Sequence, residues 1–289
     1  MGKFKISILH HRLENKQSSK HRLVSYLAES WNKTGLPTNM VYGVSRGVPS
    51  EIAFLHLDLS LVPEAYINFA GKFPNAVNLK LTDIRKHLFC SHRVFPGDIS
   101  TEPVIAKSDY NFNAIPEGYM KTNLKSMPLW KKIFVPEDCR YLRPPASAQR
   151  QPPYSIFKDS HSVPAEDWQE GRIIERFLPE RENDLYVLRL TFFLGSRHFT
   201  LKLKSADSII KHANIMSAEE CETPISVLEW IKQKGLDYGK IDYAIHEDKP
   251  VIYDVNKTPA ASLQYPEWRN RIVDELSPGI LDFLPSHAK

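Results

Sequence analysis

Two acids and an amide stand among apolar residues in two short segments near the C-terminal end of the sequence. Asp242 belongs to the segment 241–246, and Asp254 and Asn256 belong to the segment 251–256. The β-prone residues around them predict two strands, on which side chains two positions apart share a face. Two carboxylates and an amide oxygen suit Mg²⁺ that accompanies substrate phosphates better than zinc or copper.

The register of this predicted hairpin decides whether the two acids meet. If residues 247–249 form a three-residue loop, His246 pairs with Pro250 and Asp242 lies opposite Asp254. Opposed carboxylates repel, so we expect a positive charge between them. A two-residue loop would shift the pairing by one position and separate the acids. A hairpin whose acids face water is the alternative.

The composition is that of a globular enzyme. Of 289 residues, 42% are hydrophobic and 25% are charged. No run approaches the roughly 18 apolar residues of a membrane span, so no membrane partner is expected. Cys90, Cys139 and Cys221 are widely separated and odd in number. Such cysteines are typical of reduced thiols, which favours a cytoplasmic protein without disulfides, and no zinc spacing is present.

The charge balance argues against a nucleic-acid partner. The net charge is +4, from 38 basic and 34 acidic residues. Basic and aromatic residues are not interleaved into a stripe, as they are in proteins that bind single-stranded nucleic acids. A local cluster of cations would fit a phosphorylated ligand, and a mixed solvated surface would explain it equally well.

The first hundred residues predict a small open α/β sheet. His56 and Asp58 share a face where the third strand ends, and ligands bind at this edge of such sheets. The pair is either a substrate contact or a cap of the following turn. The predicted strands are 5–9, 39–42, 52–57 and 76–78, and the predicted helices are 20–33 and 63–73.

A Pro-rich segment, residues 118–160, follows and predicts an exposed loop or lid, since long loops are uncommon unless they are functional or disordered. Regular structure resumes from residue 154. The predicted strands there are 154–160, 172–178, 185–195 and 198–205, with a helix start at 164–170 and a helix at 224–234.

Three motifs, taken in chain order, resemble the ATP-grasp superfamily and its carboxylate-amine ligases. The first is the apolar strand 103–109, which contains Lys107. The second is the sequence Glu-Arg-Phe-Leu at 175–178, a hinge-like motif. The third is the hairpin of the two acids, which ends in Asp254, Asn256 and a following proline.

The resemblance covers residues 83–262 and implies an α/β (α+β) chain with an ATP-grasp fold of two α+β lobes, preceded by a small open-sheet α/β domain. The expected domains are residues 1–82 as the N-terminal domain, 83–175 as the small lobe with the Pro-rich segment, and 176–289 as the large lobe with the metal site.

The resemblance also implies which residues bind ATP. Lys107 and Lys86 would contact its phosphates, although Arg85 competes with Lys86 for this role. A glutamate at the hinge would accept from the adenine amino group, and a later one would hold the ribose, with Glu180 as the rival candidate. The implied nucleotide-binding residues are Lys86, Lys107, Glu175, Arg176, Phe177, Leu178 and Glu182. Of these, Arg176 and Leu178 would contact adenine through their backbone.

Mg²⁺, or Mn²⁺ in its place, would be bound by Asp242, Asp254 and Asn256. Basic residues on the predicted sheet would need an anionic partner, which the γ-phosphate or an acyl phosphate would supply. A solvent-facing strand surface is the alternative. The implied catalytic cations are Arg189, Lys202, Lys204 and Lys211.

The sequence departs from the family pattern in two places. Many relatives have a glycine-rich loop after the lysine strand, but residues 108–118 contain glycine only at Gly118. Asn111 and Asn113 can adopt a left-handed turn there. Asp254 stands where glutamate is more usual, which shortens the reach to a metal by one carbon.

The implied activity is an ATP-dependent ligase that joins a carboxylate to an amine through an acyl phosphate and releases ADP and phosphate. The substrates would be small amino-acid-like or peptide-like molecules, whose identity the sequence does not reveal. The sequence does not reveal the oligomeric state either. Residues such as Ser262, Gln264 and Tyr265 would help to select them. An ATP-grasp kinase and a non-catalytic nucleotide-binding module are the alternatives.

Overall fold

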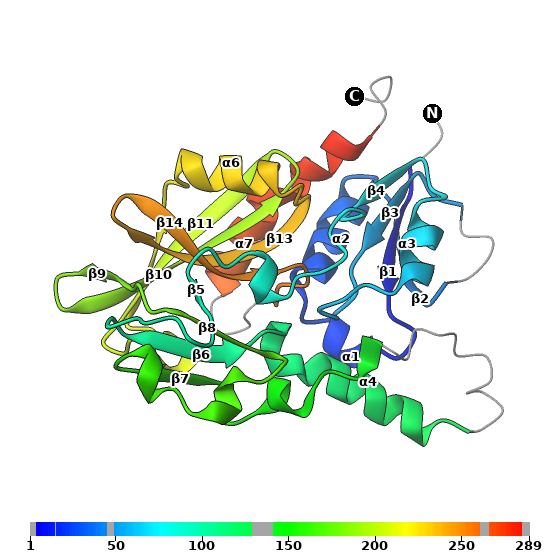
Figure 1. Cartoon of the computed structure of the whole chain (residues 1–289). Coiled ribbons are helices and arrows are strands. Elements are labelled where there is room, and N and C mark those ends of the chain that lie inside the picture. The colour runs from blue at the N-terminus through cyan, green and yellow to red at the C-terminus, as the bar shows by residue number, and fades with distance from the viewer. Residues whose placement is uncertain (1–3, 15, 45–48, 129–140, 261–265, 285–289) are drawn as a thin grey trace.

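The computed structural model describes residues 4–14, 16–44, 49–128, 141–260 and 266–284, and it contains three β-sheets (Figure 1). Successive stretches of the chain form them. Among the described residues, no helix is both long enough and apolar enough to span a bilayer.

The N-terminal sheet is parallel. Its elements are β1 (Ile6–His10), α1 (Lys16–Ser19), α2 (Leu23–Lys33), β2 (Thr38–Tyr42), β3 (Ile52–Leu55), α3 (Glu64–Ala70) and β4 (Asn75–Val77). The strand order is β2-β1-β3-β4. The strands are short apolar runs because both faces are covered. α2 covers one face with Leu27 and Trp31, and α3 covers the other with Tyr66 and Ala70.

The middle sheet is antiparallel, with the strand order β5-β8-β6-β7. Its strands are β5 (Arg93–Val94), β6 (Val104–Ser108), β7 (Tyr154–Phe157) and β8 (Arg172–Arg176). Val104 and Ala106 pack with Ile174 in a small core. Side chains alternate along a strand. Lys107 of β6 and Glu175 of β8 therefore project from the opposite face, on neighbouring strands.

A helix, α4 (Ile115–Ser126), occupies the first part of the segment 118–160 that was predicted to be a loop, so that part of the prediction is wrong. Pro116 lies in its first turn, where the missing N–H is tolerated. Met120 packs with Leu13 and Leu59 of the N-terminal domain. This burial stabilises a helix that has only weak periodicity. Residues 129–140, including Cys139, lie outside the described residues, as do Ser262, Gln264 and Tyr265.

The third sheet is the largest. Its strands are β9 (Glu180–Glu182), β10 (Leu185–Leu194), β11 (Arg197–Ser205), β12 (Ser217–Cys221), β13 (Tyr238–His246) and β14 (Lys249–Asn256). The order is β12-β11-β10-β13-β14, and β9 pairs with β10. α6 (Ile225–Gln233) covers one face and α7 (Pro266–Leu276) covers the other. Neither β12 nor α7 was predicted.

α7 and α2 belong to one hydrophobic core, which joins the N-terminal sheet to the third sheet. Trp31 of α2 is buried there, and its indole N–H donates to the carbonyl oxygen of Ser277 at 2.9 Å. Short 3₁₀ helices complete the fold: η1 (Lys86–Leu88), η2 (Asn111–Ala114), η4 (Ala146–Gln149), η5 (Ser160–Ser162), η6 (Ala165–Trp168), η7 (His212–Asn214) and η8 (Ser277–Phe283).

The β13–β14 hairpin reaches the predicted pairing of its acids by a different route. His246 pairs with Lys249, so the loop has two residues, Glu247 and Asp248, and the predicted three-residue loop is wrong. A β-bulge then inserts one residue, Tyr253, into β14. The bulge cancels the shift, and Asp242 lies opposite Asp254 as predicted.

The hairpin loop yields a prediction about stability. Asp248 has a left-handed φ of 60°, which aspartate tolerates and a β-branched residue does not. We expect Asp248→Val to lower the free energy of unfolding by about 1 kcal/mol, measured by urea denaturation. Asp248→Gly is the control and should match or exceed the wild type, because glycine adopts this φ freely. Equal stability of the two variants would contradict the assigned turn.

Candidate active site

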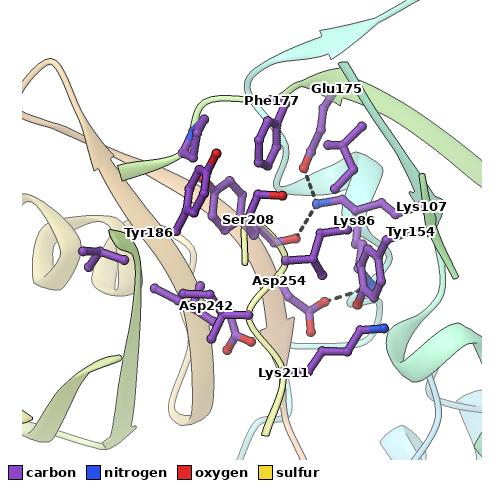
Figure 2. Close-up of a pocket in the computed structure, with 17 residues that line it drawn as sticks. Lys86, Lys107, Tyr154, Glu175, Phe177, Tyr186, Ser208, Lys211, Asp242 and Asp254 are labelled. Carbon is purple, nitrogen blue, oxygen red and sulfur yellow. Dashed lines mark hydrogen bonds and ion pairs between the residues drawn. The ribbon is translucent and has the colours of Figure 1, made fainter. Parts of the chain in front are cut away.

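A cleft lies between the middle sheet and the third sheet, and most of the residues predicted to bind ATP line it (Figure 2). It encloses about 820 Å³ of empty space, including open solvent at its mouth. Its lining residues are Lys86, Ile105, Lys107, Tyr154, Glu175, Phe177, Pro179, Tyr186, Val187, Leu188, Ser208, Ile209, Ile210, Lys211, Asp242, Tyr253 and Asp254.

Lys107 is the lysine that connects the two sheets. It forms a buried ion pair with Glu175, and its ammonium group also donates to the carbonyl oxygen of Tyr253 at 2.9 Å. Tyr253 is the bulge residue of β14, whose carbonyl is free of the regular ladder at that position. The thiol of Cys90 donates to the second oxygen of Glu175 at 2.8 Å. Burial, followed by the charge of Glu175, raises the pKa of Cys90 to about 12, so this thiol stays protonated.

Lys86 makes the second contact across the cleft. Its ammonium nitrogen lies 3.0 Å from Oδ1 of Asp254 and donates to the carbonyl oxygen of Tyr110 at 2.9 Å. The side chain is 5% exposed, so the loop before the middle sheet holds a buried cation against β14. Arg85, the rival candidate, pairs instead with Asp83. The structure therefore brings Lys86 to the cleft and Arg85 to a local ion pair.

The two acids of the hairpin each have a lysine neighbour. Lys86 neutralises Asp254, and Nζ of Lys240 lies 2.8 Å from Oδ1 of Asp242. Burial raises the pKa of Asp242, although Lys240 opposes this effect. The positive charge expected between the acids is thus supplied by lysines. Asn256 lies opposite Lys240, and its side-chain oxygen accepts from the backbone N–H of Thr258 at 2.8 Å.

Lys240 was not identified from the sequence. It stands two positions before Asp242 on the same strand, and residues at this spacing share a face. In the predicted hairpin Lys240 lies opposite Asn256, and this position could have identified it as a neighbour of the two acids.

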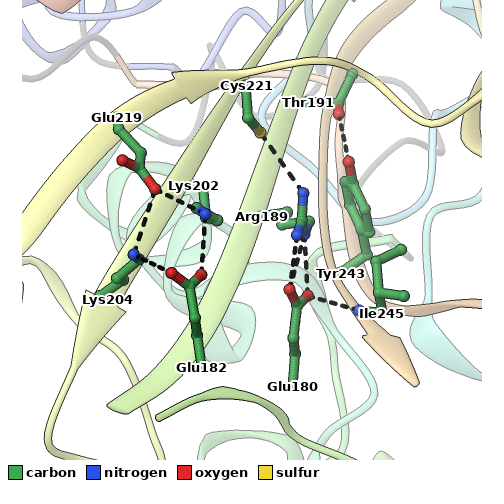
Figure 3. Close-up of polar contacts among 10 residues, drawn as sticks. All are labelled: Glu180, Glu182, Arg189, Thr191, Lys202, Lys204, Glu219, Cys221, Tyr243 and Ile245. Carbon is green, nitrogen blue, oxygen red and sulfur yellow. Dashed lines mark hydrogen bonds and ion pairs between the residues drawn. The ribbon is translucent and has the colours of Figure 1, made fainter. Parts of the chain in front are cut away.

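Three of the four predicted catalytic cations lie on the other face of the third sheet (Figure 3). Leu188 lines the cleft, so Arg189, the next residue on β10, projects away from it. Lys202 pairs with Arg189 in the ladder and shares this second face with Lys204. None of these three cations lines the cleft.

Carboxylates of the chain itself satisfy these cations. Arg189 forms a bidentate ion pair with Glu180, and Lys202 and Lys204 bind Glu182 at 2.9 and 2.6 Å. Hydrogen bonds from the two lysines lower the pKa of Glu182 to about 2. The anionic partner inferred from the sequence is therefore internal, and the structure brings neither Glu180 nor Glu182 to the cleft.

The remaining predicted residues lie at the cleft or its edge. Phe177 and Lys211 line it, and Nζ of Lys211 is 5.7 Å from the ring centre of Tyr154 on the opposite sheet. The backbone N–H of Arg176 donates to the carbonyl oxygen of His92, and the carbonyl of Leu178 accepts from the Tyr253 hydroxyl at 2.7 Å. Both of these backbone groups already have partners in the protein.

The turn after the lysine strand is left-handed without glycine. Phe112, Asn113 and Ala114 have φ values of 44°, 57° and 55°. The prediction that asparagine adopts this conformation is right for Asn113, whereas Asn111 is not among the residues with positive φ. Consecutive non-glycine residues with positive φ store strain, which persists where surrounding contacts hold it. Gln149 supplies one such contact by donating to the carbonyl oxygen of Ala114 at 2.9 Å.

The Lys107–Glu175 pair yields a prediction about stability. Lys107→Met leaves a buried carboxylate without its cation, which should lower the free energy of unfolding by about 3–5 kcal/mol in denaturant titrations. The double variant Lys107→Met/Glu175→Gln should recover most of this loss. Lys158→Met removes an exposed lysine near the same sheet and should change stability by less than about 1 kcal/mol. Equal effects of Lys107→Met and Lys158→Met would contradict the buried pair.

Comparisons with known proteins concern the fold alone. No family model matches the sequence, and no curated protein matches it significantly. Among solved structures, a RiPP-associated ATP-grasp ligase of Chryseobacterium gregarium, in complex with ADP and a leader and core peptide, has a TM-score of 0.51 at 10% identity over 98% of both chains. The D-alanine–D-alanine ligase of Bacillus anthracis has a TM-score of 0.49 at 8% identity over 97% of both chains. The chain therefore shares the fold of the Chryseobacterium gregarium ATP-grasp ligase, with two α+β lobes preceded by a small parallel α/β unit.

Proposed function

We propose that the chain is an ATP-dependent ligase that joins a carboxylate to an amine through an acyl phosphate. One observation supports this proposal above the others. A single cleft between two sheets holds two buried lysines, Lys86 and Lys107, and two opposed acids, Asp242 and Asp254. Phosphates need cations, and the metal ion that accompanies them needs oxygen ligands.

The nucleotide would be positioned by residues from both sheets. Ile105, Phe177 and Leu188 offer apolar contacts for adenine, and Glu175 lies among them to accept from its amino group. The ammonium groups of Lys86 and Lys107 would contact the phosphates as point charges. Lys86 pairs with Asp254 and Lys107 pairs with Glu175, so each buried ammonium group has a carboxylate partner of the protein.

The donors in the cleft fit Mg²⁺, or Mn²⁺ in its place. Asp242 and Asp254 provide hard oxygen ligands, and each already lies beside the ammonium group of a lysine. These two acids would hold the ion, with Asn256 at the edge of the set. When bound, the ion would neutralise charge on the β- and γ-phosphates during phosphoryl transfer.

The reaction requires positioning and charge neutralisation rather than a side-chain nucleophile. An oxygen of the substrate carboxylate takes the γ-phosphoryl group of ATP, and ADP leaves. An amine then attacks the acyl carbon, phosphate leaves, and the amine loses a proton. Lys211 is the predicted catalytic cation that faces this space, so it is our candidate for contacting the transferred phosphoryl group.

A peptide-like molecule is the substrate class that we favour. The Chryseobacterium gregarium ligase, whose fold is similar, was solved with a leader and core peptide. A carboxylate and an amine of a peptide would both suit the chemistry. Phosphorylation of a hydroxyl group would use the same nucleotide contacts, and product analysis separates it from ligation.

A nucleotide-binding module without catalytic activity is the second candidate. The left-handed turn at Phe112–Ala114 favours it, because this turn replaces the glycine-rich loop of many relatives. Binding of Mg-ATP without ADP release across carboxylate, amine and peptide panels would support this alternative.

The metal-binding acids yield a prediction about turnover. Asp242→Asn and Asp254→Asn should each lower Mg-dependent ADP release by on the order of a hundredfold, because each removes a charged oxygen ligand. Circular dichroism would establish that both variants remain folded. Glu219→Gln changes an acid on the opposite face of the sheet and should keep wild-type turnover. Unchanged turnover in both aspartate variants would overturn the assignment.

Lys211 yields a prediction about nucleotide affinity. Lys211→Ala should weaken Mg-ATP binding by about 1.5–3 kcal/mol, more than tenfold in Kd, because a charged hydrogen bond to phosphate is lost. Isothermal titration calorimetry measures the change. Lys249→Ala removes an exposed lysine at the hairpin loop and should bind like the wild type. Wild-type affinity in Lys211→Ala would remove this residue from the site.

A further inference from the structure

Two buried histidines and a glutamate meet at the carboxyl edge of the N-terminal sheet. His10 ends β1, His56 follows β3, and β1 and β3 are parallel neighbours. The ends of both strands therefore lie at one edge. Glu14 comes from the turn that follows β1.

The three side chains are close enough to bind one ion. One ligand atom from each of His10, Glu14 and His56 lies within 4.8 Å of the others. Nδ1 of His10 is 3.4 Å from Oε1 of Glu14. Both histidines are 0% exposed, and the glutamate side chain is 5% exposed. Zinc ligands lie 2.0–2.2 Å from the metal, so modest side-chain rotations would complete the site.

The imidazoles have nitrogen atoms to offer. Within the described part of the chain, neither ring nitrogen of His10 and neither ring nitrogen of His56 has a hydrogen-bond partner. A buried polar group without a partner costs about 1–3 kcal/mol. A neutral imidazole keeps the lone pair that binds a metal.

Other contacts orient the candidate ligands. Oε2 of Glu14 accepts from the backbone N–H of His11 at 3.0 Å, which leaves Oε1 facing His10. The His10 ring stacks on Tyr42, with ring centres 4.9 Å apart and an interplanar angle of 17°. Such outer contacts orient ligands at metal sites.

A charged pair beside the cluster has its own partners. Arg22 forms an ion pair with Asp58, and Oγ1 of Thr258 donates to the other oxygen of Asp58 at 2.8 Å. Asp58 is therefore engaged and is not counted as a ligand. The sequence predicted that His56 and Asp58 share a face, either as a substrate contact or as a cap of the following turn, whereas the structure groups His56 with His10.

We infer that His10, Glu14 and His56 form a site for a divalent transition-metal ion such as Zn²⁺. Two imidazoles and one carboxylate are a ligand set for zinc or ferrous iron, and they leave a further coordination position open. The site is separate from the acids in the ATP cleft, which offer only oxygen ligands. It does not depend on the proposed ligase activity.

The test uses the full chain, stripped with a chelator and titrated with Co²⁺, whose visible absorption reports coordination geometry, and then with Zn²⁺ in competition. We expect one equivalent of Co²⁺ to bind the wild type and to be displaced by Zn²⁺. His56→Gln and Glu14→Gln should each weaken binding at least tenfold. His11→Gln is the matched control, since this neighbour is equally buried but outside the cluster.

Two further results would settle the interpretation. Asp254→Asn should bind Co²⁺ like the wild type, and a loss there would move the ion to the ATP cleft and overturn the inference. Circular dichroism tests whether the variants fold, and Glu14→Gln keeps the test informative if His56→Gln does not. Absence of a bound equivalent in the wild type, or unchanged spectra in both variants, would also overturn it.

Discussion

The contacts of Lys107 hold the cleft together. Its ammonium group binds Glu175 on the neighbouring strand and the Tyr253 carbonyl on the other sheet, so one buried cation contacts both lobes. The bulge that exposes this carbonyl also brings Asp242 opposite Asp254. The Lys107 contact and the acid pairing thus involve the same inserted residue. Removal of Lys107 or of Glu175 would leave the other group as an unpaired buried charge. The ion pair therefore tolerates little change.

The third sheet separates two kinds of charge between its faces. On the cleft face, Asp242 and Asp254 form ion pairs with Lys240 and Lys86. On the other face, Glu182 and Glu219 share the same two lysines and form a closed cluster. Both faces are partly charged in an otherwise apolar sheet. The cleft face borders the pocket between the two sheets, whereas the charges on the other face are paired within the sheet.

Local patterns predicted much of this fold, and contacts distant in sequence explain the failures. Alternation placed Lys107 and Asp242 on strands, because it depends only on neighbouring residues. It could not say which face of β10 would be covered, so Arg189 was placed with the phosphates. The carbonyl of the bulge residue Tyr253 accepts from Lys107 of the middle sheet, and α4 packs through Met120 against Leu13 and Leu59, contacts that local patterns do not reveal. His10 and His56 lie on different strands, and only the register of the sheet brings them together.

The core shared by α2 and α7 has a consequence for biosynthesis. Trp31 bonds to Ser277 across 246 positions, and Leu284 packs in the same cluster as Ile6. The N-terminal sheet and α2, which covers one of its faces, are synthesised well before α7, which packs against α2 in the same core. Contacts of such long sequence separation form slowly, and uncovered apolar surface favours aggregation. The nascent chain therefore exposes the apolar surface of α2 until α7 has been synthesised. The middle lobe lies between the two halves of this core in the sequence, and it can complete its own sheet during that time.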